Sequence, residues 1–166
     1  MSDADAGIGT NGPPMKSLDH EQYMRRAVAL TANCPDLPFG ALVVSGATGE
    51  VLVEGWNRTA INPIWHGEID ALNRLAALGR REGDAGLVLY TTAEPCPMCM
   101  AAALWSGIGT VVFGASIAYL QHQGWQQIDI RAEDVVRRSP GWDCTLVGGV
   151  LEAECEALFE PQPEAR

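Results

Sequence analysis

Two short motifs place a histidine, a glutamate and two cysteines where they could hold and use a metal ion. His66 and Glu68 flank one residue in the first motif, and Cys96 and Cys99 bracket two residues in the second. One nitrogen and two sulfur donors suit Zn²⁺, and three protein ligands leave the fourth tetrahedral position open for water. Zinc lowers the pKa of such a water toward neutrality, and a glutamate that does not bind the metal can carry protons. The pattern therefore predicts a catalytic zinc site.

Each part of this pattern has a simpler interpretation when it is taken alone. A single C-x-x-C can be a redox pair or half of a structural zinc site, but a four-cysteine site needs a second C-x-x-C, which the sequence lacks. His66 alone could be a core or capping histidine, and Glu68 could be a fourth ligand that closes the site. We favour His66, Cys96 and Cys99 as the zinc ligands and Glu68 as the proton shuttle, because one imidazole and two thiolates already suffice.

The composition is that of a globular protein with an acidic surface. Of the 166 residues, 47% are hydrophobic, which is ample for a core. Polynucleotide binding needs a basic footprint, whereas here 11 Lys and Arg face 21 Asp and Glu, for a formal net charge of −10. We therefore expect a small-molecule partner rather than a nucleic acid. No apolar run of about 18 residues is present, so the sequence predicts no membrane span.

The length favours one compact domain, which we place over residues 15–160. Residues 1–14 are rich in Gly, Asp and Pro and lack an apolar signal core, which predicts a disordered tail and a cytoplasmic protein. The five cysteines are an odd number, and in such a chain they are more typical of metal ligands and free thiols than of disulfides.

The elements that must position the two motifs alternate between helices and strands. Periodicity and capping signals predict helices over about 19–33, 66–79, 96–106 and 151–159, with a partly helical stretch over 117–138 that breaks at Gly124. Strands are predicted over 40–44, 51–56, 87–91, 111–113 and 145–147. This order predicts an α/β fold, a three-layer α/β/α arrangement around a central five-stranded mixed sheet. Both motifs fall at helix starts, where thiolates are stabilised.

The motifs and their flanks resemble the cytidine/deoxycytidylate deaminase superfamily, and more narrowly its guanine deaminase and tRNA adenosine deaminase branch. The resemblance runs from about Asp36 to Val150 and is closest over LYTTAEPCPMC at residues 89–99. It implies a cytidine deaminase-like fold, a zinc cofactor, hydrolytic release of ammonia and a homodimer. It also implies that Glu68 moves the protons, and that the backbone N–H of Cys96 helps to position the attacking oxygen.

The same resemblance implies which residues contact the substrate. The segments PFGA at 38–41 and GWNR at 55–58 match segments that line the base pocket in that branch. Phe39, Ala41 and Trp105 are therefore expected at the pocket, with Asn57 as the hydrogen-bonding partner of the base. Taken alone, Asn57 is typical of a turn after a strand, and the two aromatic residues are equally typical of a core.

Other positions leave the substrate open. Gly67 is typical of fungal cytosine deaminases, whereas Glu94 before the zinc cysteines is typical of the purine branch, and Trp125 falls where guanine deaminases carry an aromatic residue. We interpret the chain as a zinc-dependent hydrolytic deaminase of a free nucleobase or nucleoside-like amino heterocycle, of guanine or cytosine type. One alternative is a tRNA adenosine deaminase, against which the net charge argues. Another is a non-catalytic zinc-stabilised nucleotide-binding module, which would not need Glu68.

Overall fold

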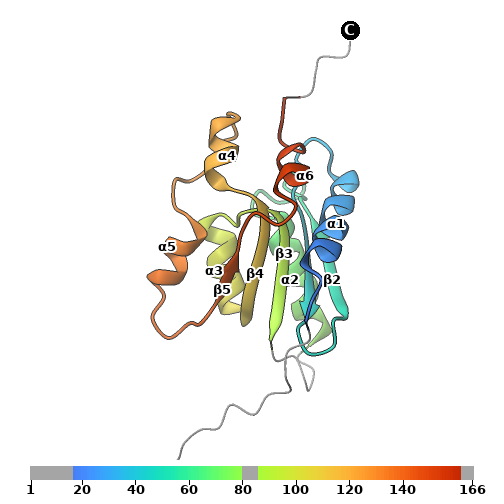
Figure 1. Cartoon of the computed structure of the whole chain (residues 1–166), viewed down its shortest axis with the longest axis vertical. Helices are drawn as coiled ribbons and strands as arrows, with labels where there is room; N and C mark the ends of the chain where they lie inside the picture. Colours follow the sequence, from blue (N-terminus) through green and yellow to red (C-terminus); the bar gives the residue numbers. More distant parts are fainter. Residues whose placement is uncertain (1–16, 80–85, 162–166) are drawn as a thin grey trace, which may run out of the picture.

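A five-stranded sheet with helices on both faces forms the body of the protein (Figure 1). The computed structural model describes residues 17–79 and 86–161. The tail predicted at residues 1–14 lies outside the described residues. Among the helices of the described part, none combines the length and apolar character that crossing a membrane requires.

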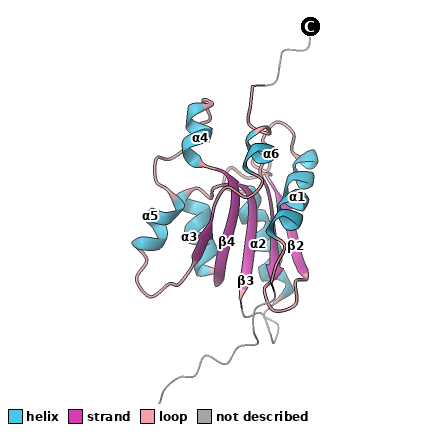
Figure 2. Cartoon of the chain, in the orientation of Figure 1, coloured by secondary structure: helices cyan, strands magenta, loops and turns pink. Residues whose placement is uncertain are grey.

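The sheet is mixed, as predicted. Its strands are β1 (Gly40–Ser45), β2 (Val51–Trp56), β3 (Leu87–Ala93), β4 (Ile108–Ala115) and β5 (Thr145–Val147), in the spatial order β2-β1-β3-β4-β5. The β1 strand is antiparallel to β2 and β3, while β3, β4 and β5 run parallel (Figure 2). The β4 strand is longer than predicted. Gly109 and Gly114 interrupt the apolar pattern of the sequence, and for this reason the predicted strand was too short. A Cβ on Gly114 would lie 2.2 Å from the Cys155 sulfur, so packing requires that glycine.

A helix forms in each segment where the sequence predicts one, but the helices in the C-terminal part of the chain are shorter than predicted. They are α1 (His20–Leu30), α2 (Gly67–Leu78), α3 (Pro97–Trp105), α4 (Ile117–His122), α5 (Ala132–Arg137) and α6 (Glu152–Glu156), with a 3-10 turn at Thr31–Asn33. The Asp19 carboxylate caps α1 by accepting from the Gln22 N–H at 3.1 Å. The stretch over 117–138 forms two short helices, and the connection between them contains Gly124 at φ +86°.

Two apolar layers hold the sheet between the helices. Met24 and Ala27 of α1 pack with Tyr90 on one face, and Ala71 of α2 packs with Met100 of α3 on the other. The β3 strand is the middle strand of the sheet, and every one of its residues is buried. The polar segment that follows β3 therefore emerges at the edge of the sheet formed by the carboxyl ends of the parallel strands. In α/β folds, ligands usually bind at this edge.

Four chain segments meet at that edge. Because β1 is antiparallel to both its neighbours, its start pairs with the ends of β2 and β3: Gly40 lies opposite Trp56, and Ala41 opposite Thr91. Helix α2 begins directly against this corner, since a Cβ on Gly67 would lie 2.5 Å from the carbonyl oxygen of Phe39. Packing against Phe39 therefore explains the glycine at position 67, whichever substrate the protein takes.

Candidate active site

His66, Cys96 and Cys99 converge at this edge of the sheet. The Nδ1 atom of His66 lies 3.7 Å from the Cys96 sulfur and 3.6 Å from the Cys99 sulfur. All three donor atoms lie within 4.8 Å of one another. Tetrahedral zinc with ordinary Zn–N and Zn–S bonds separates its nitrogen and sulfur ligands by about 3.5 Å. The observed separations fit that requirement, so these three residues could hold a zinc ion.

The local fold presents these ligands from two helix starts. His66 immediately precedes α2 and Cys96 immediately precedes α3, both with extended backbone, and neither side chain caps its own helix. Both side chains are thereby left available for metal. Pro97 occupies the first turn of α3, where a missing N–H has no cost, and Cys99 follows one turn along as a fully buried residue.

The pKa values of the two cysteine thiols shift in opposite directions. The hydrogen bond from Cys99 lowers the pKa of Cys96 to about 4, despite partial burial of the sulfur. The same bond, together with burial, raises the pKa of Cys99 well above its ordinary value. The hydrogen bond to Cys96 also raises the pKa of His66. Cys96 is therefore a thiolate at neutral pH, and metal binding must displace the remaining proton from Cys99.

Glu68 lies beside these residues in the first turn of α2. Its side chain is 4% exposed, and burial is the main cause that raises the pKa of its carboxyl group. A carboxyl group whose pKa moves toward neutrality can accept a proton in one step and donate it in another. In the described part of the chain, the cluster of metal-ligating side chains comprises only the histidine and the two cysteines, so the carboxylate of Glu68 is available for this role.

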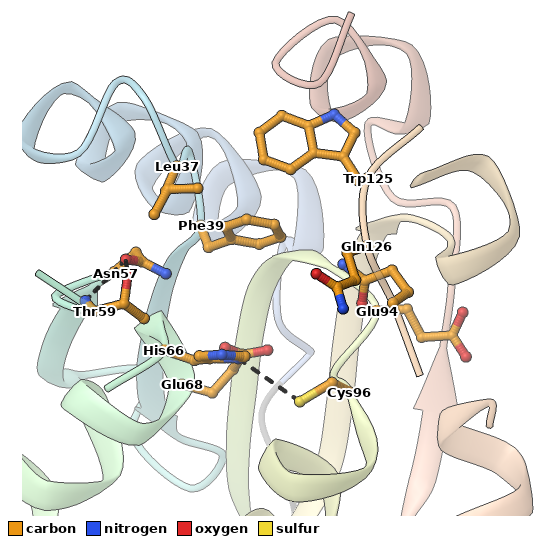
Figure 3. Close-up of a pocket in the computed structure, with 11 residues that line it drawn as sticks. Leu37, Phe39, Asn57, Thr59, His66, Glu68, Glu94, Cys96, Trp125 and Gln126 are labelled. Carbon is orange, nitrogen blue, oxygen red and sulfur yellow. Dashed lines mark hydrogen bonds between the residues drawn. The ribbon is translucent and has the colours of Figure 1, made fainter. Parts of the chain in front are cut away.

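A cavity of about 240 Å³ opens above His66 and Glu68 (Figure 3). This volume is below the roughly 300–1,000 Å³ of sites for drug-sized ligands, and it suits a single flat ring system. Two aromatic and three amide side chains contribute to its wall. Eleven residues line it: Leu37, Phe39, Asn57, Thr59, His66, Glu68, Glu94, Cys96, Trp125, Gln126 and Gln127.

The structure brings two of the four expected substrate contacts to this cavity. Phe39 and Asn57 line it, as does Trp125, whose ring stands edge-on to Phe39 with the ring centroids 5.8 Å apart. Ala41 is fully buried within β1 and does not reach the wall. Trp105 is 77% exposed and stands edge-on to Trp142 on the surface, because it lies at the opposite end of α3 from the cysteines.

Sequence reasoning missed five of the lining residues. Thr59 follows Asn57 by two positions, a spacing typical of an asparagine turn, and this signal could have identified it. Gln126 and Gln127 follow Trp125 directly, but nothing in their type predicts a place at a pocket. Leu37 was equally inconspicuous, and Glu94 was noted only for its resemblance to the purine branch.

Glu94 joins the zinc-bearing segment to the opposite wall of the cavity. Its buried carboxylate accepts hydrogen bonds from the first backbone N–H groups of α4 and α5, at Ile117 and Ala132, both at 2.9 Å. Arg131 adds contacts from Nε at 3.0 Å and from Nη2 at 2.7 Å. These bonds hold the start of α4 and the start of α5, which bracket the segment that carries Trp125 and the two glutamines, so Glu94 positions that wall.

Known proteins share this fold and these motifs. The model of the cytidine and deoxycytidylate deaminase zinc-binding region matches residues 17–115. The guanine deaminase of Bacillus subtilis is 32% identical over 142 residues, which cover 78% of this chain and 88% of that protein. The tRNA-specific adenosine deaminase of Haemophilus influenzae is 38% identical over 107 residues, 61% of each chain. The structure of NE0047 in complex with 2,6-diaminopurine matches with a TM-score of 0.72 and 28% identity, over 90% of this chain and 83% of that one.

These matches agree with the ligand geometry, the mixed sheet and the buried glutamate beside the histidine. The family model spans both motifs and the strands that bring them together. With that support, the chain belongs to the cytidine and deoxycytidylate deaminase family, as a hydrolytic deaminase with a zinc cofactor.

Proposed function

We propose that this enzyme deaminates a free nucleobase or a nucleoside-like amino heterocycle of guanine or cytosine type. The observation that carries the proposal is the lining of the cavity: none of its eleven residues is Lys or Arg. A phosphate group is normally held by such cations. Aromatic faces at Phe39 and Trp125, with amides at Asn57 and Gln126, instead suit a flat, uncharged ring that has polar edges.

In the proposed mechanism, His66, Cys96 and Cys99 hold the zinc ion and Glu68 moves the protons. When bound, zinc supplies an acidified water as the nucleophile. The Glu68 carboxylate takes up one proton of the attacking water and delivers it to the ring nitrogen beside the amine-bearing carbon. It then takes up the second proton of that water and passes it to the departing amine, which leaves as ammonia while the ring carbon keeps the oxygen as a carbonyl. We assign to the backbone N–H of Cys96 a hydrogen bond to oxygen at the reacting carbon.

A solved structure supports a small base as substrate, whereas coverage by the relatives does not separate the candidates. The guanine deaminase of Bacillus subtilis matches over 78% of this chain, and the tRNA-specific adenosine deaminase of the same organism matches over 84%. NE0047 holds 2,6-diaminopurine, an amino-substituted purine. The cytoplasmic location, the homodimer and the single domain over 15–160 stay predictions.

The second candidate is tRNA adenosine deamination, which the 38% identity to a tRNA-specific enzyme favours. The net charge of −10 opposes it, because each phosphate contact needs a cation and long-range repulsion slows the encounter with a polyanion.

Ammonia release from a panel of bases and nucleosides, measured beside tRNA binding at low salt, separates the two. We expect turnover of a base or nucleoside and no tRNA binding. Tight tRNA binding that weakens steeply with salt, with inosine formed and no base turned over, would overturn the proposal.

A further inference from the structure

We propose that Thr92 is a positioning residue that fixes Phe39 in the wall of the cavity. Its hydroxyl group holds the backbone on both sides of Phe39, so that the ring faces the heterocycle. The inference rests on the proposed function, because it requires a flat ring against Phe39. It goes further, since Thr92 does not line the cavity and acts only through its neighbour.

The Thr92 hydroxyl group makes two hydrogen bonds in the interior. It donates to the carbonyl oxygen of Pro38 at 3.1 Å and accepts from the backbone N–H of Gly40 at 3.2 Å. Thr92 is fully buried, and Pro38 and Gly40 are buried as well. One hydroxyl group thereby spans Phe39, the residue between them. A hydroxyl group can donate and accept at once, whereas a valine at position 92 could make neither bond.

This side chain extends the contact between β1 and β3 beyond their paired residues. The pairing ends where Ala41 lies opposite Thr91. Past that point, the Thr92 hydroxyl group bonds to Gly40, the first residue of β1, and to Pro38, which precedes the strand. The chain continues from Thr92 to Cys96 in four residues. The end of β3 therefore holds Phe39 at a defined place relative to that cysteine.

The backbone groups of Phe39 itself are bonded toward other segments. Its N–H donates to the carbonyl oxygen of Leu37 at 2.7 Å, and its carbonyl oxygen accepts from the Asn57 N–H at 2.9 Å. These bonds hold Phe39 from its own loop and from the end of β2. The Thr92 hydroxyl group holds the two neighbouring residues from the side of β3, so it adds a restraint that these backbone bonds do not supply.

The ring of Phe39 is the part that this arrangement presents to a ligand. It extends into the cavity above His66 and Glu68 (Figure 3). Its centroid lies 5.0 Å from that of Phe159, a buried residue outside the cavity wall, and 5.8 Å from that of Trp125. Stacking of a base on an aromatic ring strengthens binding by about fivefold to a hundredfold. A shift of the Phe39 backbone would forfeit part of that factor.

Such a residue affects binding rather than the chemical step. Stacking stabilises the bound base and the transition state alike, so weaker stacking raises KM and leaves kcat unchanged. A merely structural role for Thr92 would instead lower stability, zinc content or kcat without a change in KM. The split between KM and kcat therefore separates the two roles.

The test compares variants of the zinc-loaded full-length protein. Calorimetry gives Kd for guanine, cytosine and 2,6-diaminopurine, and ammonia release from the same compounds gives KM and kcat per bound zinc. Phe39→Ala should raise Kd and KM by about fivefold to a hundredfold. Thr92→Val should raise both by about fivefold to tenfold, with kcat within about twofold of wild type. Thr92→Ser keeps the hydroxyl group and should stay within about twofold in all three. In a Phe39→Ala protein, Thr92→Val should add less than about twofold, because both changes act through one ring.

Thr91→Val is the matched control. Thr91 is buried like its neighbour Thr92, but within the described part of the chain its hydroxyl group has no hydrogen-bond partner. Removal of that hydroxyl group leaves no other group unpaired, so Kd, KM and kcat should stay within about twofold of wild type.

A Thr92→Ser protein that loses affinity as Thr92→Val does would overturn the inference, as would effects of Phe39→Ala and Thr92→Val that multiply. So would an unchanged Kd and KM in Phe39→Ala, a result that does not depend on whether Thr92→Val folds. The expected pattern in Kd without ammonia release would refute the proposed function alone, and ammonia release without the pattern would refute this inference alone. Failure of all three compounds to bind would overturn both.

Discussion

Removal of the Glu94 carboxylate should be among the most destabilising single changes near the site, although this residue is not expected to bind zinc. Glu94 is 4% exposed and accepts from the backbone N–H groups of Ile117 and Ala132 and from Arg131. In Glu94→Ala, both N–H groups would stay buried without an acceptor. The connection that carries Trp125 would lose its attachment to the end of β3 at the same time.

The magnitude follows from these contacts. Each buried backbone donor left unpaired costs about 1–3 kcal/mol. The Arg131 side chain is 35% exposed and can turn to water, so its lost ion pair adds little. The sum for the two donors is about 2–6 kcal/mol, and domains are stable by only about 5–15 kcal/mol. Glu94→Gln keeps one amide oxygen as an acceptor and should cost about 1–3 kcal/mol.

Urea unfolding of the zinc-loaded proteins measures this effect. The matched control is Glu21→Ala, since Glu21 pairs with Arg25 on the surface with side chains 61% and 55% exposed. That control should change the free energy of unfolding by less than about 1 kcal/mol. A Glu94→Ala protein within about 1 kcal/mol of wild type would refute the reasoning, because the buried N–H groups would then have another acceptor or reach water.

Three further predictions concern the metal and the substrate. His66→Ala and Cys99→Ala should each lose bound zinc and melt at lower temperature, because metal binding is coupled to folding of its site; zinc content equal to wild type would contradict the ligand set. Zinc affinity should rise by at least about tenfold per pH unit near neutrality, because Cys99, whose pKa its hydrogen bond to Cys96 raises, must lose a proton to bind, and so must His66 wherever its raised pKa keeps it protonated. Cys96, with a pKa of about 4, has already lost its proton at neutral pH and adds nothing to this dependence. A zinc affinity that calorimetry finds to be independent of pH would refute this prediction. Asn57→Ala should lower kcat/KM by about tenfold to a hundredfold at unchanged zinc content, and an unchanged kcat/KM would return Asn57 to the role of a turn residue.

The metal cluster was predictable because its chemistry restricts both residue type and spacing. Zinc requires particular donor atoms, and the interval between Cys96 and Cys99 places both sulfurs on one side of a helix start. The mixed sheet was predictable for a similar reason, since strands that alternate with helices after a hairpin have few stable arrangements. These features depend on short stretches of chain.

The wall of the cavity depends on contacts between distant segments, and it was predicted only in part. Trp105 lies close to the cysteines in sequence, yet the length of α3 carries it to the far surface. Gln126 reaches the cavity because Glu94 holds the connection on which it lies. Neither outcome follows from residue type, because amides and tryptophans occur on surfaces, in loops and in pockets alike.

The most direct test of the account measures bound zinc and ammonia release on the same preparations of wild type and Glu68→Gln. The account predicts about one zinc per chain in both proteins, because the residues that the structure describes hold one complete ligand set. It predicts that ammonia release from the preferred base falls by about 10²–10⁴-fold in Glu68→Gln, since an amide cannot carry the proton. An active wild type without zinc, or a zinc-loaded Glu68→Gln protein within about tenfold of wild type, would contradict it.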